Sequence, residues 1–378
     1  MRVAIVHYWL LTMRGGERVV EALCELYPDA DLYTHVAKPE ALSETIRSHR
    51  IRETFIGRLP GASRHYQKYL PLMPLALEQL DLRSYDLVIS SECGPAKGVI
   101  TTPATLHVCY CHSPMRYVWD MYWDYLDEVP RPLRPVARAM LHYLRRWDLA
   151  SASRVDHFFA NSGYVAQRVR KHYRRDAEVI HPPVDTETFA PGDARADHYL
   201  LVGQLVRYKR ADLAVRAFTR LGKPLVVIGD GEQMHELRRL AGPSVRLLGR
   251  QPVSVIREHY ARCRALVFPG EEDFGIVPVE AMAAGRPVIA YGRGGALETV
   301  VDGRTGLFFD EQTEESLIGG VERFEAVEAS FDAGEIRRHA RSFDREVFKK
   351  RFGARVAELV AAQRAGGSLQ AKELRPDV

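Results

Sequence analysis

The sequence predicts an α/β protein made of two doubly wound parallel-sheet domains. Short apolar, β-branched runs alternate with helical patterns from the first residues onward, which is typical of parallel strands joined by right-handed helical crossovers. The alternation forms two series, and each is long enough for one such domain. A chain of 378 residues is also too long for one hydrophobic core, so its length independently favours two domains.

The first series begins with an expected strand at residues 3–6, a loop at 12–16 and an amphipathic helix over about 17–26. Further strands of this series are expected at 87–90, 106–109 and 157–160. The second series predicts strands at 199–202, 225–228, 245–248, 265–268 and 288–290.

The join between the series is visible in the composition, because residues 181–197 are rich in Pro, Gly and Asp and show no periodicity. We therefore expect an N-terminal domain over 1–190 and a C-terminal domain over 191–344. Residues of about 345–364 form an amphipathic helical pattern, and the polar residues 365–378 are expected to be a disordered tail.

Composition excludes several classes of protein. With 46% hydrophobic and 27% charged residues, most of the chain is expected to fold. A net charge of +4, from 53 basic and 49 acidic residues, argues against a nucleic-acid binder. Five cysteines without a C-x-x-C pair indicate neither a disulfide scaffold nor a zinc site. The sequence shows neither a secretory signal nor an apolar run long enough to span a membrane, so a cytoplasmic protein is expected.

Two strand-to-helix loops could bind an anion, because ligands of open parallel sheets bind beyond the carboxyl ends of the strands. Gly15 and Gly16 open the first helix, where backbone amides can approach an anion, although a tight turn explains paired glycines equally well. Arg207 and Lys209 precede another helix, where a cation is unfavourable for the helix itself. They indicate an anionic ligand, and the alternative is a solvated basic loop.

A third loop carries the strongest pattern. Glu272 and Glu280 flank a glycine turn, and the amides of Gly275, Ile276 and Val277 are expected to open a helix toward the ligand crevice. Glu280 then lies about one turn into that helix. The alternative for Glu280 is a structural partner of a nearby arginine.

The segment from Glu272 to Glu280 resembles the E-x7-E signature of glycosyltransferase family 4. Other segments are similar to further landmarks of this family: Gly15-Gly16-Glu17-Arg18-Val19, Asn161-Ser162, 202–209, Gly229-Asp-Gly231, Leu248-Gly-Arg250, Gly294-Gly295 with Glu298, and 302–308. The resemblance covers most of the chain. It implies a GT-B fold with two Rossmann-like domains facing a cleft, a nucleotide-sugar donor bound mainly by the C-terminal domain, a C-terminal helix returning to the first domain, retention of anomeric configuration, and no metal or other cofactor.

Residues 111–120, 206–212, 273–278 and 287–299 are similar to bacterial mannosyltransferases that build O-antigen and exopolysaccharide repeat units. This narrower resemblance implies GDP-mannose as donor and a polyprenyl-diphosphate-linked saccharide as acceptor. The alternatives are a UDP-sugar-dependent member of the family, a GT-B nucleotide-sugar epimerase, and a non-catalytic nucleotide-sugar-binding module.

The family resemblance also implies roles for single residues. Lys209 and Arg207 would neutralise the donor diphosphate, helped by the amides of Gly15, Gly16, Gly275, Ile276 and Val277. Glu280 would bind the ribose, and Glu272 would bind the donor sugar and stabilise positive charge at its anomeric carbon. His112 would bridge the sugar and the departing phosphate, with a strand-capping structural role as its alternative. The family usually has Arg where Gln204 stands, so Lys209, with or without Arg207, is expected to supply that charge.

The acceptor side is expected in the first domain, near an anionic membrane surface. Basic residues crowd the runs 47–68 and 131–146, and aromatic and aliphatic side chains lie beside them. Such a mixture suits anionic lipid headgroups, and the alternative is a solvated surface. The enzyme is therefore expected at the inner face of the cytoplasmic membrane. Asp29 and Asp31 match a metal-binding D-x-D pattern, but an Asp-containing turn explains them better.

Overall fold

The computed structural model describes residues 1–192 and 196–373, with side chains of the last helix described as far as residue 365. The chain folds into two compact units, residues Met1–Pro182 together with the segment from Phe348 onward, and residues Pro183–Val347. The first unit therefore ends before the expected boundary at 190/191. The reason is that Val184 N–H donates to Phe343 O at 3.0 Å and Phe189 packs on Tyr260, so this segment belongs to the second unit.

The first unit contains a seven-stranded sheet in which all strand pairs are parallel. The order is β3 (Ile51–Glu53), β2 (Asp31–Thr34), β1 (Val3–His7), β4 (Leu87–Glu92), β5 (Leu106–Cys111), β6 (His157–Ala160), β7 (Ala177–Val179). The strand order reverses between β1 and β4, where His7 lies opposite Ser91. A reversal of this kind creates a crevice at the carboxyl ends of the two strands, where ligands bind in open α/β sheets.

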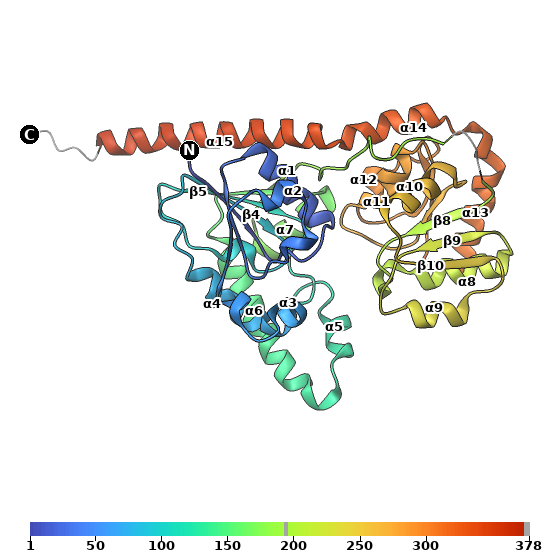
Figure 1. Ribbon diagram of the computed structural model, residues 1–378, viewed down its shortest axis with the longest axis horizontal. Coiled ribbons are helices and arrows are strands. Elements are labelled where there is room, and N and C mark those ends of the chain that lie inside the picture. The colour runs from blue at the N-terminus through green and yellow to red at the C-terminus, as the bar shows by residue number, and fades with distance from the viewer. Residues whose placement is uncertain (193–195, 374–378) are drawn as a thin grey trace, which may run out of the picture. The chain divides into compact units, whose positions relative to one another are not determined.

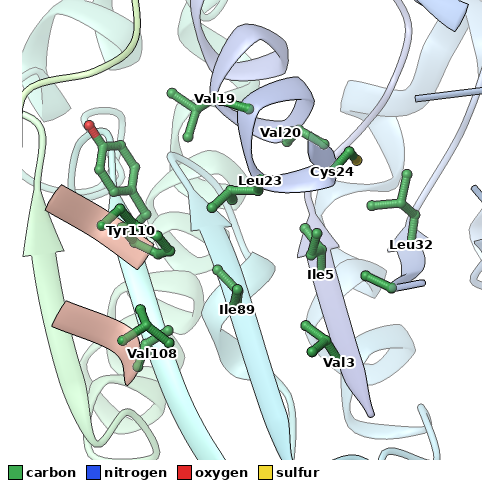
Figure 2. Close-up of a cluster of buried hydrophobic side chains, with 14 of the residues drawn as sticks. Val3, Ile5, Val19, Val20, Leu23, Cys24, Leu32, Ile89, Val108 and Tyr110 are labelled. Atoms are coloured by element: carbon green, nitrogen blue, oxygen red, sulfur yellow. The ribbon is translucent and has the colours of Figure 1, made fainter. Parts of the chain in front are cut away.

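Helix α1 (Gly15–Leu26) covers one face of this sheet because its apolar residues recur with helical spacing. Val19, Val20 and Leu23 pack over Ile5 and Ile89 (Figure 2). The remaining helices of the unit, before the last one, are α2 (Glu44–Arg47), α3 (Ala62–His65), α4 (Met73–Glu78), α5 (Tyr122–Glu128), α6 (Arg134–Ala152) and α7 (Gly163–Tyr173). Figure 1 shows α5 and α6 extending away from the sheet.

The C-terminal helix α15 (Arg345–Glu373) completes the core of the first unit. Phe348 and Phe352 are buried, and their rings lie 5.6 and 6.1 Å from the ring of Tyr110 on β5. The helix continues past the expected end at residue 364, through part of the segment expected to be a disordered tail. Residues 374–378 of that tail lie outside the described part of the chain.

The second unit contains a six-stranded parallel sheet. The order is β10 (Val245–Gly249), β9 (Leu225–Ile228), β8 (Tyr199–Val202), β11 (Leu266–Phe268), β12 (Val288–Tyr291), β13 (Gly306–Phe309). Two separate apolar clusters, which draw residues from the same strands and from different helices, form its core. The helices are α8 (Ala211–Leu221), α9 (Met234–Leu240), α10 (Val253–Arg262), α11 (Ile276–Ala283), α12 (Ala296–Thr299), α13 (Glu314–Val327) and α14 (Ala333–Ala340).

Two doubly wound parallel sheets confirm the predicted fold class. The second sheet also reverses its strand order, between β8 and β11. Among the described residues, no helix is both long and apolar enough to cross a membrane.

Candidate functional site

In the second unit, the loops after β8 and β11 bring two predicted catalytic residues together. Lys209 ends a short 3-10 turn that follows β8, and Glu272 lies in the loop between β11 and α11. Lys209 Nζ and Glu272 Oε1 are 3.0 Å apart, and the two side chains are 20% and 19% exposed. The pair flanks the strand reversal, so a cation and a carboxylate face the expected ligand position of the sheet.

Close backbone packing holds these loops in place. A Cβ added to Gly270 would lie 2.7 Å from Lys209 Cα, so only glycine lets the β11 loop approach the Lys209 turn this closely. The N–H of Gly295, after β12, donates to the backbone oxygen of Glu272 at 2.8 Å. Three loops from three strands therefore position the Lys209–Glu272 pair.

The predicted glycine turn opens helix α11. Gly275 adopts a left-handed conformation with φ of 87° and directly precedes the first helical residue, Ile276. The amides of Gly275, Ile276 and Val277 thus lie at the positive end of this helix. The structure gives Glu280 a tyrosine as a hydrogen-bond donor, since Tyr260 O–H donates to Glu280 Oε2 at 3.0 Å. Burial, reinforced by the Glu280 carboxylate, raises the pKa of Tyr260 well above its usual value, so the tyrosine remains a donor.

Arg207, the other basic residue expected at the diphosphate, is exposed, and so is Gln204, which stands where the family usually has Arg. Arg207 begins the same 3-10 turn that Lys209 ends. Of the two basic residues, it is Lys209 that the structure joins to Glu272.

In the first unit, a chain of three side chains runs across the carboxyl ends of β1, β4 and β5. His7 Nδ1 lies 3.0 Å from Ser91 Oγ, and Ser91 Oγ lies 2.8 Å from His112 Nε2. His112, predicted from the sequence, is the partly exposed end of this chain. His7 and Ser91 were not predicted, and the available signal was a polar side chain at the end of each of two strands that meet at the reversal.

The paired glycines at the start of α1 lie beside His7, the buried end of this series of side chains. A Cβ added to Gly16 would lie 2.6 Å from the Tyr8 hydroxyl and 3.4 Å from His7 Cε1. Glu17 Oε2 accepts the N–H of Arg14 at 3.1 Å, so a carboxyl group already caps the start of this helix. Burial raises the pKa of Glu17, which favours its neutral form. Gly15, Gly16 and His112 therefore lie at the same end of the first sheet.

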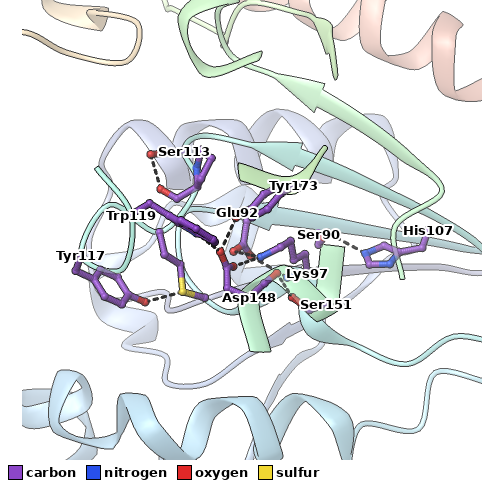
Figure 3. A network of polar contacts seen from close by, with 12 residues as sticks. Ser90, Glu92, Lys97, His107, Ser113, Tyr117, Trp119, Asp148, Ser151 and Tyr173 are labelled. Atoms are coloured by element: carbon purple, nitrogen blue, oxygen red, sulfur yellow. Dashed lines mark hydrogen bonds and ion pairs between the residues drawn. The ribbon is translucent and has the colours of Figure 1, made fainter. Parts of the chain in front are cut away.

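A buried charge cluster that the sequence did not predict joins Lys97 to Glu92, the last residue of β4, and to Asp148 of α6 (Figure 3). Lys97 pairs with Glu92 at 3.4 Å and with Asp148, and all three side chains are 0% exposed. Asp148 also accepts hydrogen bonds from Trp119 Nε1 at 2.7 Å and from Tyr173 O–H at 2.9 Å. Burial raises the pKa of Glu92 to about 7, because one ammonium cannot fully compensate two buried carboxylates.

The cluster is connected to the site through the backbone. The N–H of His112 donates to the Glu92 carbonyl oxygen at 2.7 Å, and Asn161 Nδ2 donates to the His112 carbonyl oxygen at 3.0 Å. These two hydrogen bonds hold the main chain of His112, the first residue after β5, through both its N–H and its carbonyl oxygen.

The D-x-D pattern lies away from this end of the sheet. Asp29 is in a turn, and Asp31 is the first residue of β2, where it accepts a hydrogen bond from Tyr85 and pairs with Arg52 at 3.5 Å. Within the described part of the chain, no three His, Cys, Asp or Glu side chains converge as a metal-ligand set.

Comparison with known families finds one match in each part of the chain. Residues 13–188 match a family model described as Glycosyltransferase Family 4, and residues 192–341 match one described as Glycosyl transferases group 1.

Among curated relatives, the chain is 30% identical over 235 residues to a GDP-mannose-dependent alpha-(1-6)-phosphatidylinositol monomannoside mannosyltransferase of Mycolicibacterium smegmatis, covering 54% of this chain and 61% of that protein. It is 28% identical over 225 residues to a D-inositol 3-phosphate glycosyltransferase of Geodermatophilus obscurus, covering 50% of each. The chain spans about half the length of the curated relatives it matches.

Solved structures share the fold at low sequence identity. A sucrose-phosphate synthase from Thermosynechococcus elongatus superposes with a TM-score of 0.71 at 19% identity, covering 96% of this chain and all of that one. Anabaena Alr3699/HepE in complex with UDP-glucose superposes with a TM-score of 0.71 at 15% identity, covering 95% of this chain and 100% of that chain.

Proposed function

We propose that this chain, which the two family models indicate to be a glycosyltransferase of the GT-B type and of family 4, transfers mannose from GDP-mannose to a polyprenyl-diphosphate-linked saccharide. The proposed reaction retains the anomeric configuration and needs no metal ion. The observation that carries the proposal is the Lys209–Glu272 pair at the strand reversal of the second sheet.

Lys209 supplies the positive charge that the leaving group needs. As the bond between the sugar and the diphosphate breaks, negative charge grows on the diphosphate, and an ammonium at this position stabilises it. The amides of Gly275, Ile276 and Val277 add fixed dipoles at a helix start. The ion pair with Glu272, at 3.0 Å, holds the lysine in a partly buried position.

The carboxylates then act on the sugar and the ribose. Glu272 accepts hydrogen bonds from sugar hydroxyls and stabilises positive charge at the anomeric carbon. Glu280 accepts from the ribose, and Tyr260 holds its carboxylate in place. In the first unit, His112 donates a hydrogen bond toward the sugar, Gly15 and Gly16 contribute amides, and the acceptor hydroxyl attacks the same face from which the diphosphate leaves. The departing diphosphate takes the acceptor proton.

The nucleotide is proposed from the names of relatives and from the sequence resemblance. A relative named as GDP-mannose-dependent supports GDP-mannose. A structural neighbour solved in complex with UDP-glucose supports a UDP-sugar as the alternative donor. A nucleotide-sugar epimerase would share the diphosphate-binding residues, but it would need no acceptor.

A donor panel with a matched lysine control tests the proposal. Purified protein is incubated with GDP-mannose, UDP-glucose and other nucleotide sugars, with and without a lipid-linked saccharide, and products are identified by mass spectrometry. We expect acceptor-dependent mannose transfer that Lys209→Ala lowers by about 10²–10³-fold. The control Lys223→Ala breaks another partly buried Lys–Glu pair in the same unit, at 2.7 Å from Glu325, and should retain activity. Isomerised donor without acceptor would instead establish an epimerase, and normal turnover by Lys209→Ala would refute the mechanism.

The acceptor proposal places the first unit on an anionic membrane at the inner face of the cytoplasmic membrane. The α5–α6 surface, defined by exposed Trp123, Arg131, Leu133, Val136 and Arg138, combines aromatic, aliphatic and basic side chains. Trp123 is 67% exposed and Val136 is 70% exposed. Such surfaces bind anionic headgroups while their apolar side chains enter the interface. The run 47–68 supports this less, because β3 divides it and Arg52 pairs with Asp31.

Vesicle flotation tests the membrane proposal. We expect the protein to float with phosphatidylglycerol vesicles at low salt, to bind less at high salt, and to bind neutral phosphatidylcholine vesicles weakly. The double variant Trp123→Ser with Val136→Ser should lose flotation, whereas Leu297→Ser, which removes an exposed leucine of the second unit, should not. Absence of flotation at low salt would refute membrane binding.

A further inference from the structure

We propose that His7 is a positioning residue that sets the tautomer and the ring orientation of His112 through Ser91. The chain of contacts joins His7 Nδ1 to Ser91 Oγ at 3.0 Å and Ser91 Oγ to His112 Nε2 at 2.8 Å. His7 ends β1, Ser91 is the last but one residue of β4, and His112 follows β5, so the fold itself brings them together at the strand reversal. The catalytic consequence rests on the proposed role of His112 at the donor sugar.

The position of His7 makes it a structural support for His112. His7 is 1% exposed, and its ring contacts the Tyr8 ring at a centroid distance of 3.9 Å. Ser91 is fully buried, whereas His112 is partly exposed at the far end of the chain. His7 therefore acts on a ligand only through its neighbours.

Hydrogen counting along the chain leaves two arrangements when both histidines are neutral. A serine hydroxyl has one proton to donate and can accept twice, so at most one histidine accepts from Ser91 Oγ. Ser91 is fully buried, and among the described residues its Oγ contacts only these two histidines, so its proton goes to one of them and the other histidine donates. In the first arrangement His7 Nδ1–H donates to Ser91 and Ser91 donates to His112 Nε2. In the second, His112 Nε2–H donates to Ser91 and Ser91 donates to His7 Nδ1.

The surroundings of His7 select the first arrangement. His7 Nε2 is buried and has no hydrogen-bond partner among the described residues. The second arrangement would put a proton on that atom and leave a buried N–H unpaired, which is rarer in proteins than an under-used acceptor. Burial, followed by the nearby His112, lowers the pKa of His7 well below its usual value, so His7 stays neutral.

The selected arrangement determines which atom of His112 carries the proton. Its Nε2 accepts from Ser91, so neutral His112 is protonated on Nδ1 and presents an N–H donor on the other side of its ring. The backbone hydrogen bonds of His112 with Glu92 and Asn161 hold the main chain, and the contact with Ser91 then holds the ring. His112 is thereby prepared to donate a hydrogen bond, as the proposed transfer requires.

Nitrogen NMR of histidine-labelled protein tests the assignment without any enzyme activity. We expect His112 Nδ1 to resonate as a protonated nitrogen and Nε2 as an unprotonated one. Ser91→Ala and His7→Phe should produce a mixture of tautomers at His112. His7→Asn, whose amide can donate from near the position of Nδ1, should restore the wild-type pattern.

A matched control separates this effect from general destabilisation. His35 is also buried, its Nδ1 lies 3.0 Å from Thr54 Oγ1, and its Nε2 has no partner among the described residues. It does not belong to the chain that ends at His112. His35→Phe should therefore lower the midpoint of thermal unfolding while leaving the His112 nitrogen shifts unchanged. Circular dichroism is used to confirm that each variant is folded under the conditions of the NMR measurement.

Kinetics then connect the tautomer to the reaction. With the donor and acceptor from the panel above, His7→Phe should lower kcat by about 10–100-fold with little change in donor KM, and His7→Asn should recover most of it. A wild-type His112 protonated on Nε2, or an unchanged tautomer in Ser91→Ala, would overturn the inference. A shifted tautomer with unchanged kcat would overturn the catalytic role of His112 in the proposed function and leave the tautomer assignment supported.

Discussion

The buried cluster of Glu92, Lys97 and Asp148 offers a strong test of the structure. Lys97→Met removes the ammonium while keeping much of the side-chain length and apolar volume. The variant leaves two carboxylates, both 0% exposed, without their cation. Breaking a buried ion pair from one side is among the few single changes that destabilise a protein severely.

The expected size of the effect follows from the geometry. At the 3.4 Å separation of Lys97 Nζ and Glu92 Oε1, two unit charges attract by about 5 kcal/mol at an effective dielectric constant of about 20. Part of this is offset by the cost of burying the ammonium, so we expect a loss of about 3–5 kcal/mol at pH 7.5. For a domain of this size, that corresponds to a fall of roughly 6–20 °C in the midpoint of thermal unfolding.

Differential scanning calorimetry at several pH values is the suitable assay. The loss should become smaller at low pH, because protonated carboxyl groups no longer need the cation. Arg83→Met is the matched control, since it breaks an arginine–aspartate pair whose side chains are 80% and 63% exposed, and its midpoint should stay near that of the wild type. A Lys97→Met midpoint within about 2 °C of the wild type at pH 7.5 would refute the buried cluster.

Three further predictions use the same unfolding measurements. Glu92→Gln isolates the carboxyl whose pKa rises from 4.5 to about 7 in the folded protein. Because the folded state binds the extra proton, the stability of the wild type relative to the variant should fall as pH rises between those values and then level off. A pH-independent difference would contradict this. Gly229→Ala should lower the stability by about 3 kcal/mol or more, because φ is +150° and the new Cβ would lie 1.8 Å from the Gly203 carbonyl oxygen. Gly222→Ala, also at positive φ but with open space around it, should lower it by only about 1–2 kcal/mol. Equal losses would refute the packing argument. Phe352→Ala removes a fully buried ring of α15 from the first unit's core and should cost about 3–5 kcal/mol, whereas a loss below about 1 kcal/mol would show that this helix does not complete that core.

Strand prediction from the sequence found most of the central strands and the edge strand β10, but it missed the central strand β2 and the edge strands β3, β7 and β13. β6, β8 and β9 have the predicted bounds, because a strand buried on both faces reads as a short apolar run. β3 and β7 are three-residue edge strands, and β3 reads Ile-Arg-Glu. Such a segment contains no periodicity, and pairing with a neighbour defines it instead.

The sequence also predicted only part of the candidate site. Glycines and charged residues directly after predicted strands indicated Lys209 and Glu272, since chemistry in parallel sheets gathers at strand carboxyl ends, whereas His112 was predicted from the family resemblance. His7 and the cluster of Lys97 with its two carboxylates were not found. His7 lies 84 residues from Ser91, and Lys97 lies 51 residues from Asp148, so no local pattern connects these polar residues to their partners.

By itself the sequence determined two doubly wound sheets, most of the elements that build their centres and the loops in which a ligand site is expected, because periodicity and turn composition are local properties. Only the tertiary structure decided which side chains meet. Lys209 reaches Glu272, and His7 reaches His112 through Ser91, because the strand order reverses between β8 and β11 and between β1 and β4. The physical reason is that strand order and side-chain burial are set by the packing of the whole unit, which local sequence patterns do not encode.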